Sequence, residues 1–396
     1  MSEIATGATQ VVWIKKETTQ GVFEKPAASD AVLVLSDITA KQDRIFLEDE
    51  QKRLSLSRLG KIAGPYNPGE WSIATYIKPS GSLGVEPSGS VLLEALFGKK
   101  AVTSGTKVEY SLYGVDDSII TLSMIVKRGW ETYFISGAFV DKGSFPVKAG
   151  DGNDAIFQAT FSGQFLKSYL AGTDSLSSAI DGTTTPVTTI PVSDAKKFEA
   201  GAYIVVGSDD NSGDGYKITA VDVSGNTLTI ENGVATAQDA GAVVRGWTPD
   251  VTESGYLVHG RFGMVQTSED GSSYNDFVIT EATIEIANNF NVLNDEKTGD
   301  SYPRTITKTN VRDIDISITR YFYPEDSRRR YDANNQTRFW IKIPIGDTAG
   351  KRARFEFVNV QFESPEISGD AEMSVSLKGK AYATASLDDE VQLIFD

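Results

Sequence analysis

The sequence contains no cysteine and a single histidine, His259. Without cysteine the chain has neither a disulfide framework nor a thiolate metal site, so the fold must rest on packing alone. The Ser-His and Cys-His nucleophile systems also have little to work with, because one histidine would have to serve any such site. His259 lies in the strand-like run GYLVHGRFG, where we expect a structural or surface residue.

Targeting and membrane-spanning signals are missing as well. The N-terminus, MSEIATGATQ, lacks the basic-then-apolar pattern of a signal peptide. No apolar run approaches the roughly 20 residues that a bilayer-spanning helix needs. The sequence therefore predicts a soluble protein that is made in a cytoplasm and has no membrane partner.

The short motifs of common enzyme sites are absent too. The chain has no GxGxxG, GxxxxGK[ST], HExxH or GxSxG. Runs of acidic residues at Glu48, Asp49 and Glu50 and at 388–390 have the residue type that glycoside hydrolysis uses. A chain with 54 acidic residues produces such runs by composition, however, so we predict that the protein is not an enzyme.

One acidic loop has the composition of a calcium site. Asp209, Asp210 and Asp214 cluster in SDDNSGDG and would offer hard oxygen ligands. The loop lacks the glutamate that closes an EF-hand, since Val221 stands at that place. A hairpin turn is the better interpretation, and we predict no metal site and no cofactor.

Positive charge is scarce: 38 basic residues face 54 acidic ones, which gives a formal net charge of -16. This balance opposes affinity for polyphosphate and disfavours a nucleic-acid reader. A surface past which DNA must slide without sticking would carry the same sign of charge.

Strand patterns dominate what is present. Runs rich in Ile, Val, Phe, Tyr and Thr alternate with period two and are separated by Gly, Asp, Asn and Pro. They cover 71–79, 118–128, 131–140, 155–166, 282–290, 313–324, 338–346, 352–362 and 372–383. The predicted class is mainly antiparallel β.

The middle of the chain differs in composition. A Thr/Pro-rich connector, GTTTPVTTIP, precedes short strands that are joined by tight polar turns, enough for a small β-barrel or sandwich. We therefore divide the chain into a first β domain with an N-terminal arm (1–182), a small inserted β domain (183–247) and a second β domain (248–396).

The two flanking pieces repeat one another weakly. Each has a long acidic loop, a strand that ends near Pro79 or Pro324, a helix candidate and a three-strand meander. Two tandem copies of one domain explain this order. The alternative is that β-meanders of similar length look alike.

The helix candidates of the two pieces differ in character. In PSGSVLLEALFG, Gly89 or Ser90 can serve as N-cap, and Gly98 sits where a C′ glycine belongs. The apolar face consists of Leu92, Leu93, Leu96 and Phe97. We expect this face to clip the outside of one sandwich close to a neighbouring subunit.

The second helix candidate, SRRRYDANN, is charged instead. Arg328, Arg329 and Arg330 stand out against the acidic background. Arginine is favoured at interfaces for pairing with carboxylates. We expect these residues to pair with the acidic loops at 43–50 and 295–300 of another copy; the alternative is a plain solvated helix.

The chain resembles the tail tube proteins of long-tailed bacteriophages. The resemblance rests on KKETTQGVFEKPAASDAVLVLSDITAK, GEWSIATYIKPSG, PSGSVLLEALFG, GWETYFISGAFVDKGSF, IKIPIGDTAGKRARFEFVNVQF and the final VQLIFD, and it leaves out the middle segment. It implies β-sandwich domains with a flanking helix. It also implies rings whose inner strands join edge to edge around a lumen, stacked into a tube that conducts DNA.

The same resemblance implies the partners and the place of the protein. Such rings contain six copies of the fold, so a chain with two tandem copies predicts three chains and pseudo-sixfold symmetry, and a single copy per chain predicts six. Other expected partners are tape measure and terminator proteins of the virion tail, and DNA that passes an acidic lumen without specific binding. The N-terminal arm 1–30 and the loops at 37–68 and 291–312 are expected to join rings, and the inserted domain is expected on the outer wall.

Two alternatives from other classes stay open. One is a carbohydrate-binding or adhesin-type β protein of a phage or bacterial surface, with Trp71, Trp130, Trp247 and Trp340 as stacking platforms. The other is a β enzyme that acts on polysaccharides, which the missing catalytic motifs disfavour.

Overall fold

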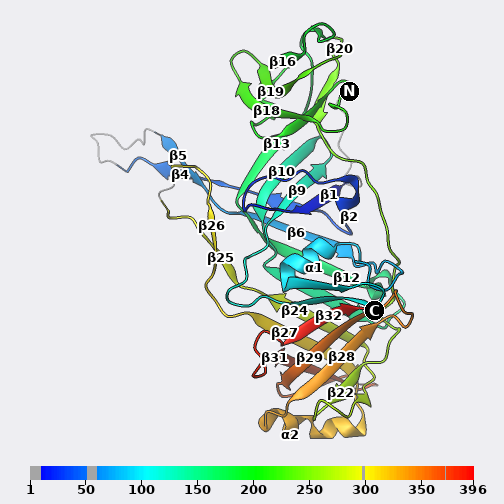
Figure 1. Ribbon diagram of the computed structural model, residues 1–396. Coiled ribbons are helices and arrows are strands. Elements are labelled where there is room, and N and C mark those ends of the chain that lie inside the picture. Colours follow the sequence, from blue (N-terminus) through cyan, green and yellow to red (C-terminus); the bar gives the residue numbers. More distant parts are fainter. Residues whose placement is uncertain (1–9, 51–59, 297–298, 371) are drawn as a thin grey trace.

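Strands with alternating burial build most of the molecule, as the period-two pattern predicts. The computed structural model describes residues 10–50, 60–296, 299–370 and 372–396. Along β6 (Gly69–Tyr76) and β27 (Asp313–Tyr321), buried residues alternate with residues that reach solvent. The body is elongated, and two hairpins project from one side of it (Figure 1).

The first half of the molecule, residues 11–171, consists of two antiparallel sheets. The outer sheet has the order β13-β10-β9-β1-β2, and the inner sheet has the order β11-β12-β6-β3. The strands are β1 (Val11–Lys16), β2 (Ala31–Leu33), β3 (Thr39–Lys41), β4 (Arg44–Glu48), β5 (Lys61–Tyr66), β6, β7 (Gly98–Thr103), β8 (Lys107–Leu112), β9 (Leu122–Arg128), β10 (Glu131–Ala138), β11 (Lys142–Lys148), β12 (Gln158–Phe165) and β13 (Lys167–Ala171). The helices are η1 (Ala28–Asp30), α1 (Ser90–Phe97) and η2 (Asn153–Ala155).

The second half, residues 266–395, repeats this arrangement. Its outer strands have the order β32-β29-β28-β22-β23, and its inner strands have the order β29-β31-β27-β24, because β29 takes part in both. The strands are β22 (Gln266–Ser268), β23 (Asn275–Asp276), β24 (Glu281–Ala287), β25 (Phe290–Leu293), β26 (Thr305–Lys308), β27, β28 (Phe339–Ile345), β29 (Ala353–Phe362), β30 (Glu366–Ser368), β31 (Ser374–Ala381) and β32 (Val391–Phe395). The helices are η4 (Pro324–Arg328) and α2 (Arg329–Asn334).

The strand orders of the two halves correspond element by element. β1 corresponds to β22, β3 to β24, β6 to β27, α1 to α2, β12 to β31 and β13 to β32, while β10 and β11 together correspond to β29 and β30. The hairpins β4–β5 and β25–β26 occupy the same place in each half. The repeat that the sequence indicates is thus present as topology.

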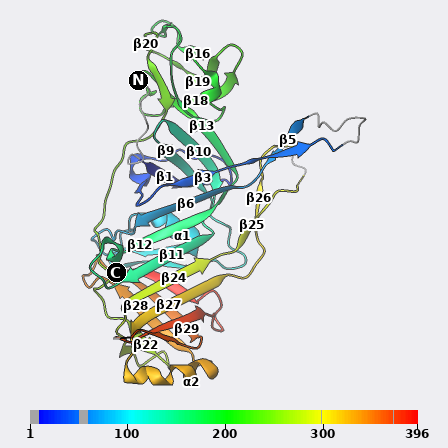
Figure 2. The same ribbon diagram turned by 180° about the vertical axis from the view of Figure 1, so that it is seen from behind.

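The two halves join edge to edge. β11 pairs with β24 over its whole length, from Lys142 opposite Ala287 to Lys148 opposite Glu281. The inner strands therefore form one antiparallel sheet, β3-β6-β12-β11-β24-β27-β31-β29, with β30 beside β31, which we call the joined sheet (Figure 2). A second link is the hairpin β7–β8 of the first half, because β8 pairs with β32 of the second.

A small β unit lies at one end of the body and begins earlier than the predicted boundary at 183. Its strands are β14 (Thr173–Ser175), β15 (Ile180–Asp181), β16 (Val187–Pro191), β17 (Tyr203–Val206), β18 (Tyr216–Asp222), β19 (Thr227–Val234), β20 (Ala237–Gln238) and β21 (Val243–Gly246), with the helix η3 (Ala195–Lys197). It shares a hydrophobic cluster with Trp13, Ile125 and Phe134 of the first half. The unit is therefore packed onto the outer sheet rather than attached by a linker alone.

Part of the predicted N-terminal arm, 1–30, belongs to the outer sheet. Residues 1–9 lie outside the described residues, but β1 pairs with both β9 and β2 in the outer sheet. Val12 and Ile14 of β1 are buried in the main hydrophobic cluster. In the part of the chain that the structure describes, no helix has the length and apolar character to cross a membrane.

Candidate assembly surface

One face of the joined sheet is packed and the other faces solvent. The packed face presents residues such as Trp71, Ile73, Phe161, Ile284 and Ile316 to the main hydrophobic cluster. The opposite face is polar because most of the alternate residues carry a hydroxyl, amide or charged group, with Ala74, Pro146 and Ala287 as exceptions. Sheets that bury one face and solvate the other show this alternation.

Charges on the solvent-facing side of the joined sheet nearly balance. Its carboxylates are Glu70, Glu281, Glu285, Asp313, Asp315 and Glu366, and its lysines are Lys41, Lys142, Lys148, Lys378 and Lys380. Serine, threonine and glutamine fill most of the remaining positions on β12, β27 and β31. The net charge of the chain therefore does not describe this face.

Both ends of the joined sheet have an unpaired edge. β3 pairs with β6 and β30 pairs with β31, and within the described residues no strand pairs with the other edge of either. Free strand edges are templates for pairing with another chain. The two edges lie at opposite ends of the sheet. One molecule can therefore pair with a second molecule through β3 and with a third through β30.

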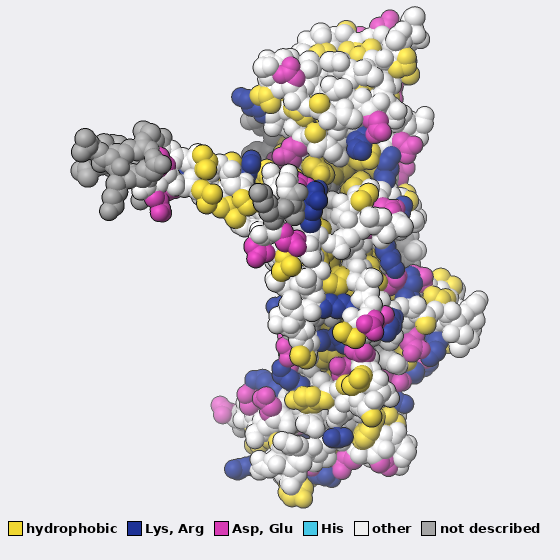
Figure 3. Space-filling model, turned by 60° about the vertical axis from the view of Figure 1, so that its left-hand side comes forward, with side chains coloured by type: hydrophobic (Ala, Val, Ile, Leu, Met, Phe, Trp, Pro, Cys, Tyr) yellow, Lys and Arg dark blue, Asp and Glu magenta, His cyan; other side chains and the backbone are white. Residues whose placement is uncertain are grey.

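The loops expected at 37–68 and 291–312 are two β-hairpins on the same side of the body (Figures 1 and 2). Parts of both hairpins, 51–59 and 297–298, lie outside the described residues. The ring of Tyr66, at the base of β4–β5, stacks on the ring of Tyr302, in the loop between β25 and β26, with centroids 4.6 Å apart. Apolar side chains line the β4–β5 arm in Figure 3, and they include Phe46, Leu47 and Ile62, which are all exposed.

The apolar face of α1 lies inside its own chain. Leu92, Leu93, Leu96 and Phe97 are all 0% exposed and belong to the main hydrophobic cluster. This corrects the expectation that these four side chains reach a neighbouring subunit, because nothing of them is left at the surface. The helix begins after the N-cap Gly89 and ends at Gly98, whose φ of 108° suits glycine.

Helix α1 nevertheless lies at the junction between the two halves of the chain. Asn288, just after β24 of the second half, donates its Nδ2 hydrogen to the carbonyl oxygen of Leu96 at 2.8 Å. A side chain on Gly143 of β11 would overlap with Leu96 Cδ2. The helix therefore packs where the two halves of one chain meet.

The three arginines after Pro324 have different environments. Arg329 is mostly buried and pairs with Asp326 and Asp332 at 3.3 and 3.6 Å, and Arg328 pairs with Asp332 at 3.0 Å. Arg330 is exposed and makes no ion pair with a described residue. Arg328 and Arg329 therefore pair with carboxylates of their own chain, and a contact of these arginines with another copy stays a prediction.

A buried arginine holds the start of this helical segment. Arg320 of β27 is 3% exposed and pairs with Glu325 and Asp326 at 2.8 and 3.4 Å. Its guanidinium also lies over the rings of Phe277 and Tyr323. Ion pairs and cation–π contacts thus hold the α2 segment on the second half, whereas buried leucines hold α1 on the first half.

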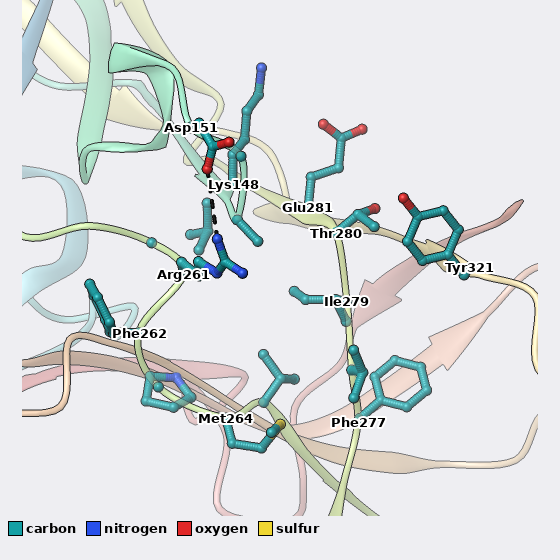
Figure 4. Close-up of a pocket in the computed structure, with 18 of the residues that line it drawn as sticks. Lys148, Asp151, Arg261, Phe262, Met264, Phe277, Ile279, Thr280, Glu281 and Tyr321 are labelled. Carbon is teal, nitrogen blue, oxygen red and sulfur yellow. Dashed lines mark ion pairs between the residues drawn. The ribbon is translucent and has the colours of Figure 1, made fainter.

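A hollow of about 790 Å³ lies beside the junction of β11 and β24 (Figure 4). Met264, Phe277 and Ile279 form apolar parts of its lining, and Arg261 pairs with Asp151 at 3.7 Å on its rim. Thr280 in the lining donates its hydroxyl hydrogen to the carbonyl oxygen of Thr319 at 2.9 Å. In the described part of the chain, no cluster of three or more His, Asp or Glu is placed to hold a metal ion.

The residues that carried the alternative interpretations have structural partners. His259 Nδ1 accepts a hydrogen bond from the backbone N–H of Arg261 at 3.0 Å. Asp209 accepts hydrogen bonds from the hydroxyls of Tyr216 and Thr236, at 2.7 and 2.6 Å, and so stabilises its turn.

The acidic run 388–390 and the tryptophans are also accounted for. Asp388 and Glu390 both pair with Arg312, at 3.7 and 3.8 Å. Trp71 and Trp247 are buried and cannot serve as stacking platforms for a sugar. Trp340 is half-buried. Trp130 is therefore the most exposed of the four candidate tryptophans.

A family model described as "Phage tail tube protein" matches residues 7–255. This range covers the first half and the small β unit and stops before β22, whereas the resemblance read from the sequence left the small unit out and continued to the C-terminus. No curated protein matches the chain.

Proposed function

This chain belongs to the phage tail tube protein family, and from that premise we propose that it is the subunit that self-assembles into the stacked rings of a phage tail. Family membership makes it a structural component of the virion tail. In the proposal, the rings surround a lumen through which DNA leaves during ejection.

The ring is proposed to contain three chains with pseudo-sixfold symmetry. The observation that carries this number is the edge-to-edge join of β11 and β24, which places two equivalent units side by side in one chain. A head-to-tail contact that repeats the same rotation closes into a ring and leaves no free edge. Three such chains present six units.

The lumen wall is proposed to be the solvent-facing side of the joined sheet. Affinity for DNA through counterion release requires a net positive face. On this face lysines are offset by neighbours, as where Lys380 pairs with Asp313 at 2.8 Å. A hydroxyl-rich surface with nearly balanced charge supports passage of DNA without specific binding.

Contacts between rings are proposed for the hairpins β4–β5 and β25–β26. They project from the same side of the body and leave Phe46, Leu47 and Ile62 exposed. The small unit lies on the outer sheet, away from the joined sheet, which is compatible with a place on the outer wall. Rings at the ends of the tube would meet tape measure and terminator proteins.

Electron microscopy of the purified protein in negative stain tests the proposal. The expected result is rings or tubes with a central hole. Dispersed monomers at all concentrations and salt conditions tested would contradict it.

A further inference from the structure

The join between the two halves supplies a template for the contact between two chains. We infer that β30 of one chain pairs with β3 of the next in the register of β11 with β24, so that Glu366 faces Lys41. This inference rests on the proposed function, because it assumes that chains meet head to tail through the joined sheet.

Equivalent positions in the two halves are identified through β6 and β27. These strands end at Tyr76 and Tyr321. A proline follows each tyrosine after the same number of residues, Pro79 and Pro324, and each proline leads to a helix. Tyr76 and Tyr321 therefore occupy equivalent positions.

The residue of β24 that is equivalent to Lys41 of β3 follows from the partners of β6 and β27. Lys41 of β3 lies opposite Glu70 of β6, and Glu285 of β24 lies opposite Asp315 of β27. Glu70 and Asp315 stand at the same number of residues before Tyr76 and Tyr321. Lys41 thus takes the place of Glu285.

The residue of β11 that is equivalent to Glu366 of β30 follows in the same way from the partners of β12 and β31. Ser144 of β11 lies opposite Thr160 of β12, and Glu366 of β30 lies opposite Ser376 of β31. Thr160 and Ser376 are equivalent, because the residues two places before them face Tyr76 and Tyr321. Glu366 thus takes the place of Ser144.

The charges at the two free edges are complementary. Inside the chain Ser144 faces Glu285 across the join. The same register between chains brings Glu366 opposite Lys41, and opposite charges directly across a strand pair are stabilising. Within the chain Glu366 pairs with Lys378 at 3.0 Å and Lys41 pairs with Asp43 at 2.7 Å. Both ion pairs are exposed, so they contribute little to stability and can rearrange.

An exposed aromatic residue gives independent support for the same contact. Phe290 follows β24 and packs edge to face on Tyr113 and Phe139 of the first half, with ring centroids 5.6 and 6.0 Å apart. Phe46 stands at the same spacing after Lys41 as Phe290 does after Glu285, yet it is 60% exposed. A second chain placed by the register would lie over Phe46.

The contact between chains lacks one element that the internal join has. The hairpin β7–β8 follows α1 and crosses to β32, whereas α2 is followed directly by β28. The contact between chains therefore has fewer strands across it. A ring should dissociate into whole chains before a chain separates into its halves.

Charge reversal tests the inferred register. Lys41→Glu and Glu366→Lys should each reduce ring yield by roughly tenfold, because like charges then face each other across the edge, and the double variant should restore it. Lys217→Glu on the small unit is the matched control and should leave ring yield unchanged, since Lys217 lies far from both edges. Normal ring yield in both single variants would overturn the register.

Cysteine pairs give a second test, because the natural chain has no cysteine. Thr39→Cys with Ser368→Cys should form disulfides between chains under oxidation, since Thr39 and Ser368 take the places of Thr283 and Pro146, which face each other inside the chain. Thr39→Cys with Ile367→Cys is the control shifted by one residue and should not cross-link.

The outcomes separate this inference from the proposed function. Rings that form without a disulfide in the first pair, or with a disulfide in the shifted pair, would overturn the register while leaving the ring proposal intact. A natural chain that never forms rings would contradict the proposed function itself.

Discussion

Removing the side chain of Leu96 should destabilise the chain at the join between its halves. Leu96 is 0% exposed, and its Cδ2 occupies the space beside Gly143 of β11. Leu96→Ala should cost about 2–5 kcal/mol of unfolding free energy through lost burial and a cavity. Gly143→Ala should cost about 1–3 kcal/mol, because the new methyl group overlaps with Leu96.

The two substitutions should compensate each other when combined. The methyl group of Gly143→Ala enters the space that Leu96→Ala vacates, so the double variant should be more stable than the sum of the single costs by about 0.5–3 kcal/mol. Urea unfolding followed by tryptophan fluorescence measures all three free energies. Leu257→Ala, at an exposed leucine, should stay within about 0.5 kcal/mol of the natural chain. Additive costs would refute the packing of α1 against β11.

Three further predictions concern charge and the small unit. Burial raises the pKa of Asp141, so its charged form opposes folding; Asp141→Asn, which can still accept from the N–H of Phe290, should raise the urea midpoint at pH 7, and this gain should vanish below about pH 4, where the acid is neutral in both states. Arg329→Met should cost about 1–3 kcal/mol, because Asp326 and Asp332 each lose one of two arginine partners and keep the other, whereas Arg330→Met should change thermal stability by less than about 0.5 kcal/mol. Deleting 173–246 should uncover Phe134 and cause aggregation in light scattering, and a fully stable deletion variant would show that the small unit is a mere decoration.

Strand positions were predictable because the alternation of apolar and polar residues along each strand reflects which side chains are buried. β6 and β27 alternate along the sequence as they do in the structure, and Pro79 and Pro324 mark their ends. The partner of an edge strand is different, since it is not encoded in that strand alone. Nothing in the sequence of β11 or β24 identifies the other, and so the joined sheet emerged only from the structure.

The fate of the two helices shows the same limit. The leucines of α1 predict an apolar face, but periodicity does not say whether the surface they cover belongs to the same chain. For α2 a signal was present: Asp332 lies four residues after Arg328 and three after Arg329, the spacing at which side chains meet on a helix. The predicted acidic lumen stays a prediction, because net charge carries no information about which face holds the charges.

The mass of isolated rings tests the central claim most directly. Native mass spectrometry of purified rings should give three chains of 42.8 kDa each, since every chain contributes two equivalent units. A ring of six chains would contradict the account, because the two halves of one chain would then not occupy equivalent places around the lumen.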